Sequence, residues 1–427
     1  MITVMLSLLF FYLKEVNEEE QPTIHLIIMT HKFNVLVGAL LVAGTSIGGG
    51  MLALPVLTSV TGFIPSLFIY LLCWLFMAST GLLFLEITQW MHKEANIVSM
   101  AQRTLGKGGK IAAWILYLFL FYSLNIAYIV ESGKTVVDLT NGQIADWMGP
   151  ILFLLLFAPC IMISTSLAGR INLILMLGLI LSYACFVILG IQFVNPQLLT
   201  SAYWHEAPKA LPIAFTSFAY QGIIPTLANY LHYDIAKGRK AILIGSFIPL
   251  IAYVIWQILI MGIVPIEGTH GLEEALKKDF NAIQAMKYFM DHSYTYVIGQ
   301  SFAFFALVTS FLGVTLGLRD FLSDGLHIKQ NMTGKIFLIS LIFIPPLLIA
   351  IVYPHIFLTM LEYAGGIGCA LLLGLLPVIM VWRGRYHFHF QEKEQLFGGK
   401  YLLAILGLFV ICEVMFELLK IKIKLIG

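Results

Sequence analysis

Long apolar stretches separated by short polar segments follow one another along almost the whole of this chain of 427 residues. Each stretch has about 20 residues and almost no charge, which is the length that an α-helix needs to cross a bilayer. Irregular backbone facing lipid would leave polar groups unsatisfied, so helices are favoured over a barrel. The pattern predicts an all-α membrane protein with eleven transmembrane helices, at residues 33–60, 64–90, 111–133, 150–168, 171–193, 210–232, 241–264, 294–318, 336–353, 356–381 and 401–419.

The composition agrees with this pattern. Hydrophobic residues make up 59% of the chain and charged residues 11%, whereas a soluble domain has about 45–50% and about 25%. Scarce charge, 13% aromatic residues and a net charge of +2 exclude a soluble domain, a disordered chain and a nucleic-acid partner. The five cysteines lie in apolar runs without metal-ligand spacing, so we expect no metal centre built on them and no cofactor.

Lysine and arginine are unevenly distributed between the segments that join the helices. If the segment before the first helix is cytoplasmic, 17 of these residues fall inside and 8 outside. Cytoplasmic loops are enriched in both residue types, so the N-terminus is expected inside and the C-terminus outside. The apolar start of residues 1–28 is too short to span, and no cleavage site follows it. We expect an interfacial or disordered appendage there, with Met29 as the functional start.

The first predicted helix is interrupted near its middle by Gly44-Thr45-Ser46-Ile47-Gly48-Gly49-Gly50. Each glycine costs about 1 kcal/mol relative to alanine in a helix, so four of them predict an unwound segment. Unwinding leaves free carbonyls on one side and free N–H groups with a positive dipole end on the other, which together can bind a zwitterion. The alternative is close helix packing through Gly44 and Gly48.

A similar interruption lies in the sixth predicted helix, where Phe218, Tyr220 and Gln221 precede Gly222 and Pro225. It falls five helices after the first one. A repeat with an odd number of spans must be inserted upside down in its second copy, so the two interrupted helices would meet near the midplane.

This spacing predicts two inverted repeats, at residues 29–193 and 194–381, followed by a cytoplasmic loop and an eleventh helix at 382–427. Such an organisation is typical of secondary transporters. A polytopic membrane enzyme is the alternative, but it would need a cluster of catalytic side chains at one membrane face, and the sequence has no such pattern.

The longest outer segment, residues 267–291, has an amphipathic pattern. Its apolar positions at helical spacing are Leu272, Ala275, Leu276, Phe280, Ile283 and Met286. We expect one helix lying over the outer mouth, either as a plain surface helix or as a lid.

Residues 42–55, Val-Ala-Gly-Thr-Ser-Ile-Gly-Gly-Gly-Met-Leu-Ala-Leu-Pro, closely resemble the first-helix signature of the hydroxy/aromatic amino acid permeases. Residues 80–86, 215–218 and 309–318 match the same family, and the resemblance runs from Lys32 to the last helix. It implies a leucine-transporter-like fold of the amino acid–polyamine–organocation superfamily. It also implies import of tyrosine, tryptophan or phenylalanine with protons across the bacterial inner membrane, which would make the outside periplasmic. We expect tyrosine as the substrate; the sequence leaves the oligomeric state open.

The resemblance also implies which residues bind the substrate. The glycine-rich break would hold the amino and carboxyl groups, and Tyr220 would form an aromatic lid. The family often has histidine where this chain has Gln221, so a titrating group is absent there. Aromatic walls are expected from Tyr122, Tyr128 and Phe305. The expected substrate-binding residues are Gly44, Thr45, Ser46, Gly48, Gly49, Gly50, Asn125, Phe218, Tyr220 and Gln221.

Few ionisable residues fall within the predicted helices, and burial of each would cost about 2.5–3.5 kcal/mol. They are Glu86, Glu131, Glu362, Glu413 and Glu417. Glu86 could carry the coupling proton, cap backbone or pair with Lys93. Glu131 and Glu362, towards outer helix ends, could serve gating or proton entry or be solvated. For Glu413 and Glu417, on the peripheral last helix, we expect no role in transport.

A sodium site is the alternative to proton coupling. Ala306, Thr309 and Ser310 share one helix face, and the carbonyls of Gly44 and Ile47 could complete an oxygen cage. Hydroxyls in membrane helices more often bond to their own backbone, and the family favours protons. We therefore expect proton symport.

Overall fold

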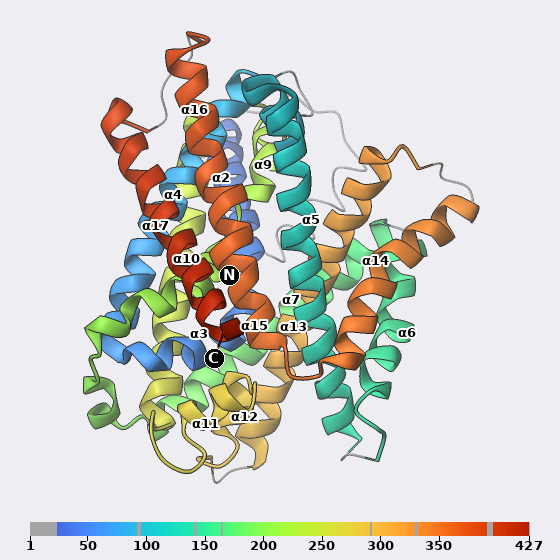
Figure 1. Ribbon diagram of the computed structural model, residues 1–427, viewed down its shortest axis with the longest axis vertical. Helices are drawn as coiled ribbons and strands as arrows, with labels where there is room; N and C mark the ends of the chain where they lie inside the picture. The colour runs from blue at the N-terminus through green and yellow to red at the C-terminus, as the bar shows by residue number, and fades with distance from the viewer. Residues whose placement is uncertain are drawn as a thin grey trace.

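The computed structural model describes residues 24–91, 95–140, 143–163, 165–290, 293–328, 332–390 and 396–426. These residues form a bundle of helices, and no strand occurs within them (Figure 1). The all-α class is therefore confirmed. Of the expected N-terminal appendage, residues 1–23 lie outside the described part of the chain.

Eight helices in the described part are long and apolar enough to cross a bilayer. They are α4 (Phe63–Gln89), α5 (Ile97–Leu139), α7 (Thr165–Gly190), α10 (Ile235–Ile263), α13 (Ser293–Gly325), α14 (Met332–Val352), the continuous run of α15 (Phe357–Tyr363), η6 (Ala364–Leu375) and α16 (Leu376–Tyr386), and α17 (Gly399–Ile426). A ninth span is formed if α2 (Ile24–Ser46) and α3 (Gly50–Thr58), which meet at an angle of 57°, are taken together.

The remaining two predicted spans correspond to shorter helices. The stretch 150–168 contains α6 (Met148–Ile163), and the stretch 210–232 is divided between α8 (Leu211–Ser217) and α9 (Ile224–Tyr230). Each predicted stretch therefore contains a helix, but eleven complete spans remain a prediction. Short 3-10 turns join the elements, at η1 (Ser59–Thr61), η2 (Ile191–Phe193), η3 (Pro196–Thr200), η4 (Trp204–Ala210) and η5 (Gln221–Ile223).

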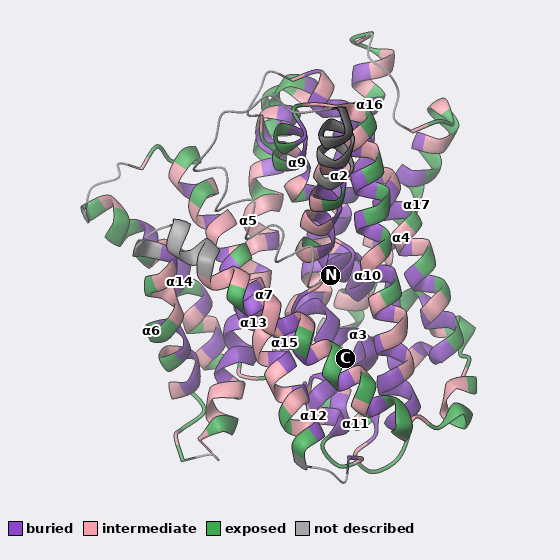
Figure 2. Ribbon diagram, turned by 180° about the vertical axis from the view of Figure 1, so that it is seen from behind, coloured by how far each residue is buried: buried purple, intermediate pink, exposed green. Residues whose placement is uncertain are grey.

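The helices pack in two groups with α5 between them. In one group α2 packs along α10, which also contacts α4; in the other α13 packs along α7. The α5 helix contacts α6 and α13 on one side and η6 on the other (Figure 1). Buried residues gather inside the bundle, while α6, at its edge, carries several exposed residues (Figure 2). Leu155, Ile188 and Leu348 are exposed apolar side chains of the kind that contact lipid.

The outer segment differs from the single amphipathic helix that the pattern predicts. It forms two short helices, α11 (Leu272–Lys277) and α12 (Ala282–Met286), at one end of the bundle (Figure 1). Asp279, with φ of 55°, ends the first, and the Asn281 side chain accepts hydrogen bonds from the first N–H groups of the second. A backbone turn and a strong N-cap interrupt the helix where the apolar pattern alone would continue it. Both helices contact α3.

Candidate functional site

The first long helix is interrupted where the glycines predict it. The α2 helix ends at Ser46 and α3 begins at Gly50, so the unwound residues are 47–49. The freed N–H of Gly49 donates a hydrogen bond to Ser310 Oγ on α13, with an N–O distance of 2.8 Å. The break thus releases a backbone N–H from the helical pattern and ties it to a neighbouring helix.

A second interruption lies directly beside the first. The α8 helix ends at Ser217, and α9 begins at Ile224 after residues 218–220 and the turn η5. The helices α3 and α8 pack together, and a Cβ added to Gly50 would lie 3.2 Å from Ser217 Oγ. The prediction that two interrupted helices meet is confirmed for these described residues.

One tyrosine of α10 connects the two breaks. The Tyr253 hydroxyl lies 2.7 Å from the carbonyl oxygen of Ser46 and 2.8 Å from that of Ser217. These carbonyls end the first halves of the two broken helices, where intrahelical partners are missing. Tyr253 is buried, and its one O–H hydrogen is available to either carbonyl or shared between them.

The glycines of the first break allow other helices to approach closely. A Cβ on Gly49 would lie 2.5 Å from Tyr128 Cε1, and one on Gly48 would overlap Ser310 Oγ. Close packing through small residues, the alternative explanation of the glycine run, therefore occurs together with unwinding rather than in its place. A larger residue at either position would force the side chain of Ser310 on α13 or of Tyr128 on α5 to shift.

Three buried polar atoms near the breaks have no hydrogen-bond partner in the described part of the chain. They are Ser46 Oγ, Ser217 Oγ and Asn125 Nδ2. Buried polar groups are normally paired, so these atoms can hydrogen-bond a bound molecule. Asn125 uses its other atom, Oδ1, to accept a hydrogen bond of 2.9 Å from Thr315. Thr45, by contrast, donates to the carbonyl of Leu41 in its own helix.

The residues of the second break are held by α4. The Tyr220 hydroxyl donates to the carbonyl of Met77 at 3.1 Å, and the Gln221 amide donates to Thr80 Oγ1 at 3.0 Å. Phe218 packs edge-on against Tyr253. All three expected substrate residues are buried. Tyr220 lies at the break as expected, and its role as a lid stays a prediction.

The Thr309 and Ser310 hydroxyls already take part in hydrogen bonds, with α13 itself and with the first break. Thr309 Oγ1 lies 2.8 and 3.2 Å from the carbonyl oxygens of Phe305 and Ala306, to which it can donate its one hydrogen. Ser310 Oγ accepts from the Gly49 N–H. Donation to its own helix is the local pattern expected of a membrane-helix threonine, and it leaves lone pairs on Thr309 Oγ1. The sodium site stays a prediction.

Glu86 has a bidentate partner that the sequence pattern did not indicate. Arg385 Nε donates to Oε1 at 2.7 Å and Arg385 Nη2 donates to Oε2 at 2.6 Å, and both side chains are almost fully buried. Lys93, the expected partner, lies outside the described residues. The Glu86 carboxylate is thus fixed by a pair of charge-assisted hydrogen bonds.

At the opposite end, Glu131 belongs to a buried polar cluster that also includes Lys134, Asp279 and Asn281. Asn281 Nδ2 donates to Glu131 at 2.5 Å, and Lys134 Nζ lies 3.3 Å from Glu131 and 2.8 Å from Asp279. Asp279 also accepts from the N–H groups of Phe357 and Leu358, which begin α15. The cluster therefore ties the outer segment to α5 and α15.

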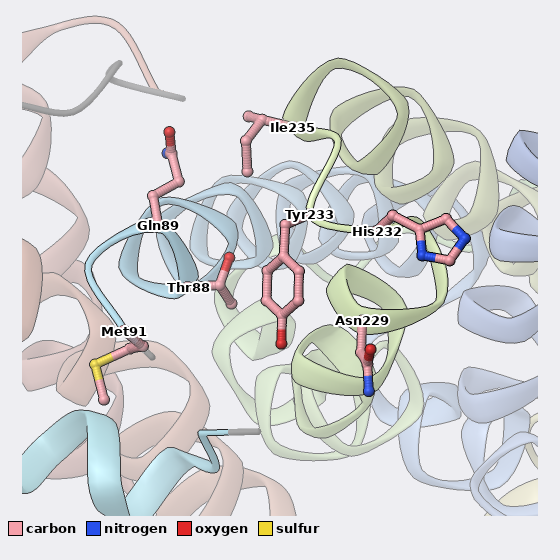
Figure 3. A pocket seen from close by; sticks show the side chains of 7 residues that line it. All are labelled: Thr88, Gln89, Met91, Asn229, His232, Tyr233 and Ile235. Carbon is pink, nitrogen blue, oxygen red and sulfur yellow. The ribbon is translucent and has the colours of Figure 1, made fainter. Parts of the chain in front are cut away.

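A cavity of about 480 Å³ lies at the end of the bundle that holds Glu86. Its wall is made by α4, α9 and the turn before α10, and Tyr233 lies between Thr88 and Asn229 (Figure 3). His232 and Tyr233 have φ of 52° and 58°, a strained conformation for residues other than glycine. None of the expected substrate-binding residues lines this cavity.

Several residues at these sites were missed by sequence reasoning. Tyr253 and Trp256 face the breaks from α10, and Trp256 Nε1 donates to the carbonyl of Met51 at 2.9 Å. Both are common aromatic residues in a long apolar helix, and no local pattern marks them. Arg385 falls in the predicted cytoplasmic loop, after the span predicted at 356–381. The need of a buried Glu86 for a cation is the signal that could have found it.

Known proteins give an independent comparison. A model of the tryptophan/tyrosine permease family matches residues 31–417. The tyrosine-specific transport system 1 of Haemophilus influenzae is 34% identical over 385 residues, which cover 87% of this chain and 94% of the relative. The tryptophan-specific transport protein of the same organism is 27% identical, over 90% of this chain and 96% of the relative.

A third relative, the low affinity tryptophan permease of Escherichia coli, is 29% identical over 90% of this chain and 95% of its own length. All three are named as permeases or transport proteins, which agrees with a transporter and not with an enzyme. The family match covers both broken helices and the helices that pack on them. This chain belongs to the tryptophan/tyrosine permease family.

Proposed function

We propose that this protein imports an aromatic amino acid, tyrosine, by proton symport through alternating access. The observation that carries the proposal is the meeting of two broken helices at Tyr253. Beside them are the hydroxyls of Ser46 and Ser217, which have no hydrogen-bond partner among the described residues. Helix termini at a break supply N–H groups for a carboxylate and carbonyls for an ammonium group. A zwitterionic amino acid has both groups.

The aromatic side chain would lie among the buried rings that surround the breaks. Phe218 and Tyr253 are in edge contact, and Tyr128 lies against Gly49. Such rings offer apolar area with specific geometry, and Asn125 Nδ2 can donate to a phenolic oxygen. The relatives named for tyrosine are 34% and 30% identical to this chain, and this supports tyrosine as the substrate.

In this proposal the protein lies in the bacterial inner membrane with eleven helices, arranged as a leucine-transporter-like five-plus-five inverted repeat. The N-terminus is cytoplasmic and the C-terminus periplasmic. The Glu86–Arg385 pair closes the inner end, and the polar cluster of Glu131, Lys134 and Asp279 closes the outer end. Rocking of the helices about the breaks would open each end in turn.

Protons are the proposed coupling ion, and sodium is the second candidate. The family resemblance favours protons. The Thr309 and Ser310 oxygens keep lone pairs beside their hydrogen bonds, and this makes sodium the second candidate.

The test is uptake of labelled tyrosine by proteoliposomes containing the purified protein, in competition with each of the twenty amino acids. Tyrosine, tryptophan and phenylalanine should compete, with tyrosine strongest, and uptake should follow an imposed pH gradient without sodium. Competition by small amino acids equal to that by aromatic ones would contradict the proposal. A strict sodium requirement would favour the Thr309 and Ser310 alternative.

A further inference from the structure

The terminal helix α17 turns two glutamates toward the protein. Its buried face carries Leu403, Leu406 and Val410 and continues with Glu413 and Glu417, which are 2% and 0% exposed. The opposite face carries exposed apolar residues such as Ile405 and Met415. Both glutamates thus face the protein although they belong to the last helix, because helical spacing places them on its inner stripe.

This buried face of α17 packs on η6, a segment in the uncommon π-helical conformation. A Cβ on Gly366 would lie 3.0 Å from Glu417 Cγ, and one on Gly374 would lie 3.1 Å from Val410 Cγ2. Glu413 is between these two contacts on the same face of α17. Phe409, one turn earlier, contacts the rings of Phe76 and Phe215, so α4 and α8 also border this face.

The two glutamates differ in their ionic partners. Lys420 Nζ lies 2.9 Å from Glu362 and 3.7 Å from Glu417. It is seven residues beyond Glu413, or about 10 Å along the helix axis. Neither carboxylate oxygen of Glu413 has a hydrogen-bond partner in the described part of the chain, and both are buried.

An ionised carboxylate in this position would be buried without a donor or a cation beside it. That arrangement costs several kcal/mol, whereas a protonated carboxyl is neutral and fits apolar surroundings. The buried surroundings of Glu413 therefore favour the neutral, protonated carboxyl over the ionised one.

The elements that border this face carry the other titratable groups. Cys73 of α4 and Glu417 of α17 lie near Glu413, whereas Glu362 and Tyr363 of α15 lie near Lys420. Further groups are Cys369 of η6, which is buried, and Cys412 of α17, which is exposed. The α8 helix contributes no titratable side chain, and the charges of α16 lie in its last turn. Lys420 is the cation among the α17 and α15 groups, and it lies about 10 Å along the helix axis from Glu413.

The contacts of η6 connect this carboxyl to the second break. The Thr216 hydroxyl of α8 donates to the carbonyl of Leu361 at 2.7 Å, and Gly365 lies so close to the Pro212 carbonyl that a side chain could not be added. The α8 helix ends one residue after Thr216, at Ser217, whose carbonyl accepts from Tyr253. A movement of η6 relative to α17 would thus be transmitted through α8 to Ser217, at the proposed substrate site.

We propose that Glu413 binds the proton that drives transport, and this inference rests on the proposed proton symport. Glu362 and Lys420 are partly exposed, and with Glu417 they form a polar path from the end of α17 to Glu413. The Glu413 carboxylate takes one proton from the outer water and becomes neutral, which allows α17 to close on η6. After the protein opens inward, the proton leaves to the inner water with the amino acid. Binding of each ligand then favours binding of the other.

The test compares two activities of the purified full-length protein in proteoliposomes. One is accumulation of labelled tyrosine driven by a pH gradient; the other is exchange of labelled for unlabelled tyrosine without any gradient. Glu413→Gln should reduce accumulation about tenfold or more while exchange stays within about twofold of wild type. Tyrosine-induced proton uptake, followed with a pH dye, should be lost. Glu413→Asp, which keeps a carboxyl, should restore part of the accumulation.

Glu273→Gln, the same chemical change at an exposed position of α11, is the matched control and should leave both activities unchanged. Normal accumulation by Glu413→Gln would overturn the inference. Equal loss of accumulation and exchange would also overturn it, because the residue would then be needed for transport itself and not for the proton. A wild-type protein that exchanges tyrosine but accumulates it only with sodium would overturn the proposed coupling as well, before any variant is compared.

Discussion

Arg385 forms a bidentate ion pair with Glu86 inside the protein, with N–O distances of 2.7 and 2.6 Å. Both side chains are at least 95% buried, since their exposed fractions are 5% and 1%. Removing one partner of such a pair leaves a buried charge uncompensated, at a cost of about 3–5 kcal/mol. We therefore expect Arg385→Gln to lower the midpoint of thermal unfolding in detergent clearly.

The double variant Glu86→Gln, Arg385→Gln tests whether the stability lost in a single variant comes from the unpaired charge or from the changed shape of the side chain. It removes both charges while keeping hydrogen-bonding side chains, so much of the lost stability should return. The measurement is the unfolding midpoint of the two single variants and the double variant. A double variant less stable than either single one would show that the ion pair is not the source of the effect.

The glycines of the first break should tolerate no side chain. Gly48→Val would place side-chain atoms onto Ser310, so we expect uptake of tyrosine to be abolished while the protein still inserts into the membrane. Gly313→Ala is the control, because no atom lies within 4 Å of its added Cβ and it stands within the same α13 helix as Ser310. Uptake by Gly48→Val at the wild-type level would exclude the break from the transport path.

We expect uptake of tyrosine to depend on the hydroxyl of Tyr253. Tyr253→Phe leaves the carbonyls of Ser46 and Ser217 without their donor, and an unsatisfied buried acceptor costs about 1–3 kcal/mol. We expect uptake at low tyrosine concentration to fall by about fivefold to a hundredfold. Tyr183→Phe removes a hydrogen bond to the carbonyl of Ala252, one residue before Tyr253 on α10, but leaves the Tyr253 hydroxyl at the carbonyls of Ser46 and Ser217, and should change uptake less. Equal effects of the two changes would argue against a special role of Tyr253.

Asp279 should stabilise the outer segment by two interactions at once. It pairs with Lys134 and accepts from the first N–H groups of α15, so Asp279→Asn should weaken an ion pair as well as a cap. Asp234, which caps α10 through the Lys237 N–H and is partly exposed, gives the matched cap variant Asp234→Asn. We expect the larger loss of thermal stability at Asp279, beyond the about 1 kcal/mol of a lost cap. A loss no larger than that of Asp234→Asn would mean that the buried lysine needs no partner.

Sequence reasoning predicted the helices and the two breaks because both leave local signals. Apolar length marks a helix, and a cluster of glycines or a Gly-x-x-Pro pattern marks an interruption. It could not predict which helices meet, so the contacts of Tyr253 and Arg385 with distant residues stayed hidden. The apolar spacing predicted one helix at 267–291, but the backbone turn at Asp279 ends α11 there. The periodicity of apolar residues does not reveal such a turn.

The glutamates of α17 are a second case in which the sequence did not reveal contacts between distant segments. Their positions in the last helix were clear from the sequence, but a helix that faces lipid on one side gives no sign of which side faces the protein. The burial of Glu413 and Glu417 depends on η6 and its glycines, which lie some fifty residues earlier in the chain.

Proton movement on addition of tyrosine tests the central claim most directly. Proteoliposomes with the purified protein, a pH-sensitive dye inside and no sodium would receive tyrosine from outside. The account predicts that the interior becomes more acidic with tyrosine and does not change with a small amino acid. No change with tyrosine, in vesicles that exchange labelled tyrosine normally, would contradict it.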